Sequence, residues 1–284
     1  MTDEPTSGDL RTRQVLVVAL AALSGGTDAI GLLALGGAFT SVMTGNLVLL
    51  GTASTTADGA LALSSGTAVL AFCLGVALGT VLAGTPQPGD GVWPARVTRA
   101  LAVEGALLVA YATGWWMSGA DRGATAALVL LATTAVALGV QSSTVQRFGV
   151  SGLSTTFLTG TLTAIVVRLS TRRPPREVLP SIQVIAGLVI GAAAGAGIVS
   201  VLPDAAPALQ LVLVGSVLLV ALLRFHRRRA VTSPDAHSYA TGRVQGAGAP
   251  SGHRHLEVPM TTIVLLLAFF ALLSVADLLP STVR

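Results

Sequence analysis

Asp28 is the residue best placed to carry chemistry in this sequence, because it is an acid within a long apolar stretch. It ends the run Ser24-Gly-Gly-Thr-Asp28, about two-thirds of the way along the stretch 14–36. A carboxylate this deep in a membrane costs about 2.5–3.5 kcal/mol, so it should be protonated, paired or beside water. The adjacent glycines allow the helix to break and to offer backbone groups to a ligand. Contact with a substrate or coupling ion is the functional interpretation, and a bond that ties down a nearby turn is the structural one.

Two similar Thr-Gly motifs, 115 residues apart, form a second set of candidates. They are Thr44-Gly45-Asn46 and Thr159-Gly160-Thr161. We expect each motif at the turn of a re-entrant segment, where Thr or Asn caps a short helix and Gly permits tight backbone geometry. A helix N-terminus at membrane depth also presents free N–H groups and a positive dipole end to an anion or polar solute. Capping and lining of a solute path both stay open at this stage.

Three further polar side chains stand within or beside apolar stretches. Glu104 lies about 10 Å into one of them, counting ~1.5 Å per helical residue. It is a candidate for proton relay, and the favoured alternative is an ion pair with Arg96, Arg99 or Arg147. Gln141 and Arg147 close the next stretch, where Arg147 would neutralise a carboxylate, receive an anion or anchor the helix end.

The composition excludes several classes of catalytic site. All 17 basic residues are Arg. The chain therefore lacks the lysine that a P-loop or a Schiff base requires, which excludes ATP-driven transport by this chain alone. Cys73 is the single cysteine, and the four histidines all fall in one polar stretch, 226–255. We therefore expect no enzyme activity, no cofactor and no bound metal. In a chain as apolar as this one, an excess of basic residues indicates which loops are cytoplasmic and not a nucleic-acid site, so no nucleic-acid partner is expected either.

The candidate residues are held by long apolar segments. Of the 284 residues 52% are hydrophobic and only 11% charged, against about 25% charged in a typical soluble protein. A helix needs about 20 apolar residues to cross a bilayer. Six segments satisfy this requirement: 14–36, 60–84, 97–117, 122–143, 178–201 and 206–224. The predicted fold class is an all-α multi-pass membrane protein, with the lipid bilayer as its first partner.

The arginines predict how these six segments are oriented. In the six-span arrangement, thirteen arginines lie on the same side of the membrane as the N-terminus, and only Arg122 lies on the opposite side. Because cytoplasmic loops are enriched in positive charge, this distribution places the N-terminus in the cytoplasm. Two more stretches, 37–51 and 148–167, are apolar enough to resemble spans. We predict that both are re-entrant segments buried against protein, and full crossings are the alternative.

An internal repeat relates the two halves of the membrane domain, about 14–117 and about 122–225. The 115-residue offset carries the segment 60–84 onto the fifth span. Both of these spans have small residues at every fourth position, which allows close helix packing. The two runs are Gly75-xxx-Gly79-xxx-Ala83 and Gly187-xxx-Gly191-xxx-Gly195. Each half has three spans, so the halves must enter the membrane in opposite directions, an inverted 3+3 arrangement typical of secondary transporters.

The chain ends lie outside this membrane domain. Residues 1–13 are predicted to be a cytoplasmic tail, and 226–258 a flexible cytoplasmic linker rich in Gly, Ala, Pro and Arg. An additional hydrophobic helix follows at 259–279, and a seventh crossing or a helix lying along the membrane surface are the alternatives for it.

Four stretches of this chain resemble the signature blocks of the YoaK-like family of bacterial integral membrane proteins. They are Ser24-Gly-Gly-Thr-Asp28-Ala-Ile-Gly-Leu, Phe39-Thr-Ser-Val-Met-Thr44-Gly-Asn46-Leu-Val-Leu-Leu-Gly51, Gly139-Val-Gln141-Ser-Ser and Thr155-Thr-Phe-Leu-Thr-Gly-Thr161-Leu-Thr163. The resemblance covers about residues 11–225. It implies a bacterial plasma-membrane location, and because that family is a domain of unknown function it implies no activity or substrate.

The features together favour a secondary transporter or permease of the plasma membrane for a small polar or anionic solute. In this interpretation Asp28 and the two Thr-Gly turns line a central path between two rocking halves. A channel-like pore is the first alternative, and its flux would neither saturate nor couple to a proton gradient. A non-transporting scaffold or sensor whose Arg-rich tail meets anionic lipid is the second. The solute and the oligomeric state, a homo-oligomer included, stay open.

Overall fold

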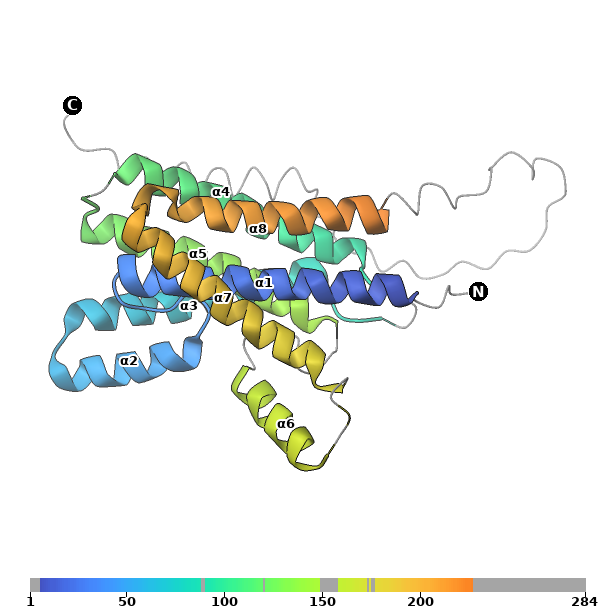
Figure 1. Ribbon diagram of the computed structural model, residues 1–284. Helices are drawn as coiled ribbons and strands as arrows, with labels where there is room; N and C mark the ends of the chain where they lie inside the picture. The colour runs from blue at the N-terminus through green and yellow to red at the C-terminus, as the bar shows by residue number, and fades with distance from the viewer. Residues whose placement is uncertain are drawn as a thin grey trace, which may run out of the picture.

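The computed structural model describes residues 6–87, 90–119, 121–148, 158–172, 174 and 177–226, and every regular element among them is helical (Figure 1). The elements are α1 (Ser7–Ala34), α2 (Met43–Thr56), α3 (Gly59–Ala83), α4 (Ala95–Ser118), α5 (Ala124–Gln146), α6 (Leu158–Ser170), α7 (Leu179–Val201) and α8 (Ala206–Ala221). A 3-10 turn at Pro203–Ala205 leads into α8. The predicted linker beyond residue 226 and the predicted helix at 259–279 lie outside the described residues.

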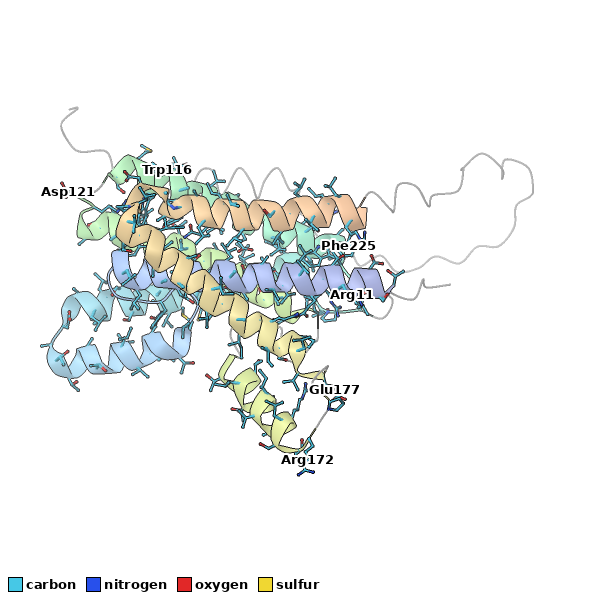
Figure 2. All side chains as sticks on the ribbon, in the orientation of Figure 1. Arg11, Trp116, Asp121, Arg172, Glu177 and Phe225 are labelled. Carbon is cyan, nitrogen blue, oxygen red and sulfur yellow. The ribbon has the colours of Figure 1, made fainter. Side chains whose placement is uncertain are left out.

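Six of these helices are long and apolar enough to cross a membrane, which confirms the six predicted spans. They are α1, α3, α4, α5, α7 and the stretch Pro203–Phe225, which contains α8. Figure 2 places Arg11 and Phe225 toward one end of the bundle and Trp116 and Asp121 at the other. The start of α1 and the end of the last span therefore lie at the same end, as an even number of crossings requires.

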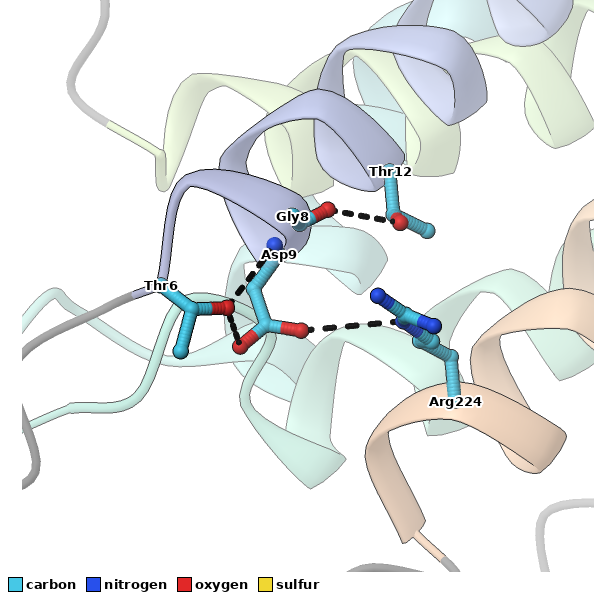
Figure 3. A network of polar contacts seen from close by, with 5 residues as sticks. All are labelled: Thr6, Gly8, Asp9, Thr12 and Arg224. Carbon is cyan, nitrogen blue, oxygen red and sulfur yellow. Dashed lines mark hydrogen bonds and ion pairs between the residues drawn. The ribbon is translucent and has the colours of Figure 1, made fainter.

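The first helix begins earlier than the sequence indicated, at Ser7 instead of residue 14. Thr6 caps it, because the Thr6 hydroxyl accepts a hydrogen bond from the Asp9 backbone N–H at 3.2 Å (Figure 3). The Asp9 carboxylate lies 3.7 Å from the Nε of Arg224, at the end of the last span. The helix therefore extends over part of the stretch 1–13 that was predicted as a tail. A polar first turn carries no hydropathy signal but is stabilised by its cap.

Glycines bring α1 and α7 into close backbone contact. A Cβ atom at Gly191 would overlap the carbonyl oxygen of Ala22, and one at Gly195 would overlap that of Gly26. From the opposite helix, a Cβ atom at Gly25 would overlap the carbonyl oxygen of Leu188. Small residues are what permit two membrane helices to approach this closely.

The second close crossing joins α3 to α5 in the same way. A Cβ atom at Gly75 would overlap the carbonyl oxygen of Val136, and one at Gly139 would overlap the carbonyl oxygen of Phe72. The prediction that the small residues of the second and fifth spans serve helix packing is therefore confirmed at both crossings.

The stretch 37–51 is not one continuous helix. The chain leaves α1 through residues 35–42 and turns helical only at Met43, and the resulting α2 lies beside α3 in Figure 1. With 14 residues, α2 rises about 21 Å, less than the ~30 Å hydrocarbon core. In the second predicted re-entrant stretch, 148–167, the described part from Leu158 is the start of the 13-residue α6, which packs against α7.

Candidate functional site

Asp28 binds the loop that follows its own helix. Its Oδ1 accepts hydrogen bonds from the backbone N–H groups of Thr40 and Ser41, each at 2.7 Å, and from the Thr40 hydroxyl at 3.0 Å. Its Oδ2 accepts one from the Ser41 hydroxyl at 2.5 Å. Both carboxyl oxygens of this buried side chain are therefore engaged by the loop. The geometry favours the structural interpretation of Asp28, a tie that holds the turn between α1 and α2.

Asn46 holds the same loop from the other side. Its Oδ1 accepts from the backbone N–H of Phe39 at 2.8 Å, and its Nδ2 donates to the Phe39 carbonyl at 2.7 Å. Gly45 permits close packing, because a Cβ atom there would lie 3.1 Å from the Phe39 ring. Thr44 is exposed and does not cap α2, whose N-cap residue Val42 makes no side-chain capping bond. Asn46 acts instead from within the first turn of the helix.

The second Thr-Gly motif stands at the start of α6. Thr159 and Gly160 are exposed and Thr161 is buried. Residues 149–157, which lead into this motif, lie outside the described part of the chain. The structure thus places both motifs in the first turn of a short helix, and it brings Asn46, but not Thr44, onto the loop that Asp28 binds.

Gln141 links the second half of the chain to the first. Its Nε2 donates to the Leu20 carbonyl at 3.1 Å and to the Ser24 hydroxyl at 2.8 Å, both on α1. Its Oε1 is buried and has no hydrogen-bond partner. Ser24 was not among the predicted site residues, although its position four residues before Asp28, on the same helix face, was a signal that could have found it.

Glu104 is completely buried in α4, and neither of its carboxyl oxygens has a hydrogen-bond partner. Leu101 and Leu108, one turn to either side of it, belong to a cluster of buried apolar residues that also contains Ala137 of α5. Gln141 lies one turn beyond Ala137. The favoured prediction, an ion pair between Glu104 and an arginine, was wrong. The physical reason is that Arg147 extends to the loop after α3 and leaves the acid without a cation.

Arg147 pairs with Asp90 in that loop, at 2.5 Å between Nη2 and Oδ2. The Arg147 side chain is only 3% exposed, whereas that of Asp90 is 34% exposed. The sequence analysis gave Arg147 two roles with a charged partner, neutralisation of a carboxylate and reception of an anion. The structure has the first of these. A hydrogen bond from the Gln87 N–H and the bond from Arg147 lower the pKa of Asp90 below its ordinary value.

Residues 16–223 match the family described as "Protein of unknown function (DUF1275)". The chain belongs to this family. It is also similar to the UPF0700 transmembrane protein YoaK of Bacillus subtilis (strain 168), with 34% identity over 160 residues, which are 56% of this chain and 68% of that protein. No solved structure matches the chain. The resemblance to YoaK-like proteins is confirmed, and the chain is a multi-pass membrane protein in contact with the lipid bilayer.

The DUF1275 match covers every predicted site residue and one feature that the sequence analysis missed. The Arg122 guanidinium lies 3.5 Å from the centroid of the Trp115 ring, a cation–π contact at the end of the bundle opposite the chain start. Trp115 is fully buried and donates from Nε1 to the Pro203 carbonyl at 3.1 Å. Arg122 therefore packs the α4–α5 connection onto Trp115, and Trp115 in turn bonds the turn that precedes α8. The available signal was that Arg122 is the only arginine on the far side of the six predicted spans, 14–224.

The Asp90–Arg147 pair predicts a measurable pH dependence of stability in this DUF1275 protein. Because the folded-state pKa of Asp90 is lowered, the pair stabilises the fold above the ordinary Asp pKa of about 3.9 and loses that contribution as pH falls through the folded-state pKa. Asp90→Asn should therefore lower the Tm in detergent at about pH 7, by the equivalent of at most ~1 kcal/mol since Asp90 is partly exposed. The difference from wild type should shrink at acid pH, as the pH falls below the ordinary Asp pKa and through the lowered folded-state pKa.

A matched control for this experiment is Asp121→Asn, which changes an exposed acid in the α4–α5 connection. It should leave the Tm close to wild type at both pH values. A constant deficit of Asp90→Asn at every pH would contradict the assignment, because it would show that the side chain's shape, and not its charge, stabilises the loop.

Proposed function

We propose that this DUF1275 protein is a secondary carrier or permease that moves a small polar solute across the bacterial plasma membrane, with its N-terminus in the cytoplasm. Activity as an enzyme is not part of this proposal. The observation that carries it is the pair of glycine crossings, α1 with α7 and α3 with α5, whose contacts correspond residue by residue.

The correspondence joins helices of one half to helices of the other. A shift of 114 residues carries Ala22 onto Val136 and Gly25 onto Gly139, and a shift of 116 carries Phe72 onto Leu188 and Gly75 onto Gly191. The contact of Gly191 with Ala22 thus has its counterpart in that of Gly75 with Val136. Likewise, the contact of Gly25 with Leu188 has its counterpart in that of Gly139 with Phe72.

Such matched crossings support two similar units, α1–α4 and α5–α8. Each unit contributes three long helices and, in second place, one short helix, α2 or α6. Three crossings per unit make the second copy enter the membrane in the opposite direction. Inverted repeats of this kind carry a solute site near the midplane at the interface between the copies, and they transport by rocking one copy against the other.

The Asp28 loop supports a re-entrant segment in the first unit. Asp28 lies six residues before the end of α1, which corresponds to about 9 Å of helix rise. Thr40 and Ser41 bind Asp28, so the loop must return to that depth before α2 begins at Met43. Irregular backbone at membrane depth is tolerated where protein buries it or where it lines a water-filled cavity.

The chemical class of the solute follows from the polar atoms at the interface of the two units that have no hydrogen-bond partner. Gln141 of the second unit donates to Ser24 of the first, and its buried Oε1 is an acceptor without a partner. Free acceptors suit a solute that donates hydrogen bonds, such as one with amine, amide or hydroxyl groups. In this proposal Gln141 faces the solute, and Asp28 and Asn46 position one wall of its path.

The test is uptake by purified protein reconstituted in lipid vesicles, with a panel of labelled neutral amino acids, polyamines, sugars and organic acids. We expect saturable uptake of at least one hydrogen-bond-donating solute, and Gln141→Leu should weaken it. Gln183→Leu, which changes an exposed amide on α7, is the matched control and should transport normally. Flux that rises linearly with concentration would favour a pore. Uptake equal to that of protein-free vesicles across the whole panel would favour a scaffold.

A further inference from the structure

Glu104 differs from the other acid buried in the bundle. Asp28 accepts four hydrogen bonds from Thr40 and Ser41. Glu104 accepts none, although it is fully buried. Buried polar groups are nearly always hydrogen-bonded, so a carboxyl with two unpartnered oxygens indicates either a functional role or a ligand that is bound there.

The helices around Glu104 provide no charge to balance it. α4 packs against α3, α5 and α8, and within their bounds these three helices contain no Asp, Glu, Lys, Arg or His. The titratable groups of α4 itself are Arg96 and Arg99, which are exposed near its start, and Tyr111, which is buried two turns beyond Glu104. On α1, which shares a cluster of buried apolar residues with α4, Asp9, Arg11 and Arg13 lie in the first two turns and Asp28 is engaged by its loop. Arg147, after α5, is engaged by Asp90.

An ionised Glu104 would therefore be an uncompensated charge in the membrane interior. A charged side chain is strongly disfavoured at the centre of a membrane helix, and a buried charge without a partner is destabilising for the same reason. The arrangement described here accommodates the carboxyl only when it carries a proton. Loss of that proton requires water to reach α4 from between the two units, where it accepts the proton and hydrogen-bonds the carboxylate that remains.

We propose that Glu104 is the proton-binding group of the carrier, so that the coupling ion is H⁺. The inference rests on the proposed function for its transport consequence. Proton binding favours the closed arrangement in which Glu104 is buried, and proton release favours an arrangement that opens toward water. A group that binds its ligand differently in two states shifts the equilibrium between them, which is the requirement for coupling.

The first arm of the test does not depend on transport. Infrared difference spectra of the purified protein between about pH 5 and about pH 10, a range that extends past the titration of buried carboxyls, should contain the carbonyl band of a protonated carboxyl that loses its proton. Glu104→Gln should remove this band, whereas Glu177→Gln, at an exposed acid before α7, should retain it. A band that persists in Glu104→Gln would overturn the proposal.

The second arm uses the reconstituted vesicles and the solute found in the uptake panel. An imposed pH gradient should drive accumulation of the solute by wild type. Glu104→Gln should reduce this accumulation by about 5- to 150-fold, the usual range of coupling between two sites. Exchange of labelled for unlabelled solute at equal concentrations should persist in Glu104→Gln, and Glu104→Asp, which keeps a carboxyl, should keep the coupling.

The outcomes separate this inference from the proposed function. If wild type moves no solute, the carrier proposal fails, and the infrared arm alone decides whether Glu104 binds a proton. If Glu104→Gln accumulates solute as wild type does, or if a sodium gradient replaces the pH gradient as the driving force, the carrier stands and the proton site is overturned. If Glu104→Gln is misfolded on a sizing column, Glu104→Asp decides the question. A shifted carboxyl band with coupling retained supports the proton site, and a band and coupling identical to wild type in every respect overturn it.

Discussion

Gly191→Ala is expected to lower the free energy of unfolding by about 3 kcal/mol or more, the upper end of the cost of over-packing. The reason is that the new methyl group would meet backbone and not a flexible side chain. A Cβ atom at Gly191 would overlap the carbonyl group of Ala22 and lie 2.6 Å from the Ala22 Cα. Neither helix can relieve this overlap without separating α1 from α7. Reversible unfolding in detergent micelles, followed by circular dichroism, measures the difference.

The same helix provides the matched control. Gly197 lies in α7, is exposed, and has nothing within 4 Å of an added Cβ atom, so Gly197→Ala should change stability by no more than about 1 kcal/mol. Equal stability of Gly191→Ala and Gly197→Ala would contradict the described crossing. The corresponding crossing offers an independent repeat of the test, since Gly75→Ala should be severe and Gly66→Ala, also in open space, should be mild.

These glycine crossings were accessible from sequence because their signal is local and periodic. Small residues at every fourth position of one apolar span identify a packing face, and a similar run at a fixed offset identifies its counterpart. The six spans were accessible for the same reason, since apolar length alone defines them. The identity of the partner helix was not accessible. Gly191 carries no information that its neighbour is Ala22 on α1, because that depends on how six helices pack.

The site residues show where local signals end. The depth of Asp28 was readable from the apolar run around it, but its partners Thr40 and Ser41 lie on a loop whose path depends on backbone turns and not on hydropathy. Glu104 was matched to Arg96, Arg99 or Arg147, the arginines predicted at the same end of the bundle. In the fold, Arg147 instead reaches Asp90, 57 residues away. The unsatisfied state of Glu104 is a property of three packed neighbours, and a single sequence does not contain it.

Asp28→Ala is expected to cost about 2–6 kcal/mol of stability, since it leaves two buried backbone N–H groups, those of Thr40 and Ser41, each at about 1–3 kcal/mol, without an acceptor. The loss should be localised in the α1–α2 loop. Hydrogen exchange measured by mass spectrometry should therefore show faster exchange over residues 35–46, and a lower Tm should accompany it. Asn46, bonded to Phe39, and Ser64, which donates to the Gly36 carbonyl at 2.8 Å, would remain to hold the loop.

Two variants make this prediction specific to the hydrogen bonds of Asp28. Asp28→Asn keeps an oxygen at the Oδ1 position, which accepts three of the four bonds, and its amide N–H can donate to the Ser41 hydroxyl, so its stability should lie between those of wild type and Asp28→Ala. Asp58→Ala removes an exposed aspartate that caps α3 by accepting from the Leu61 N–H at 3.0 Å, at a cost of only about 0.5–2 kcal/mol. Asp28→Ala must be the most destabilised of the three variants. Water can replace Asp58 as acceptor for the Leu61 N–H, because that hydrogen bond is exposed, but it cannot reach the buried N–H groups of Thr40 and Ser41. If Asp28→Ala matched wild type in hydrogen exchange, Asp28 would not hold the loop, and its burial would have to be explained by contact with solute.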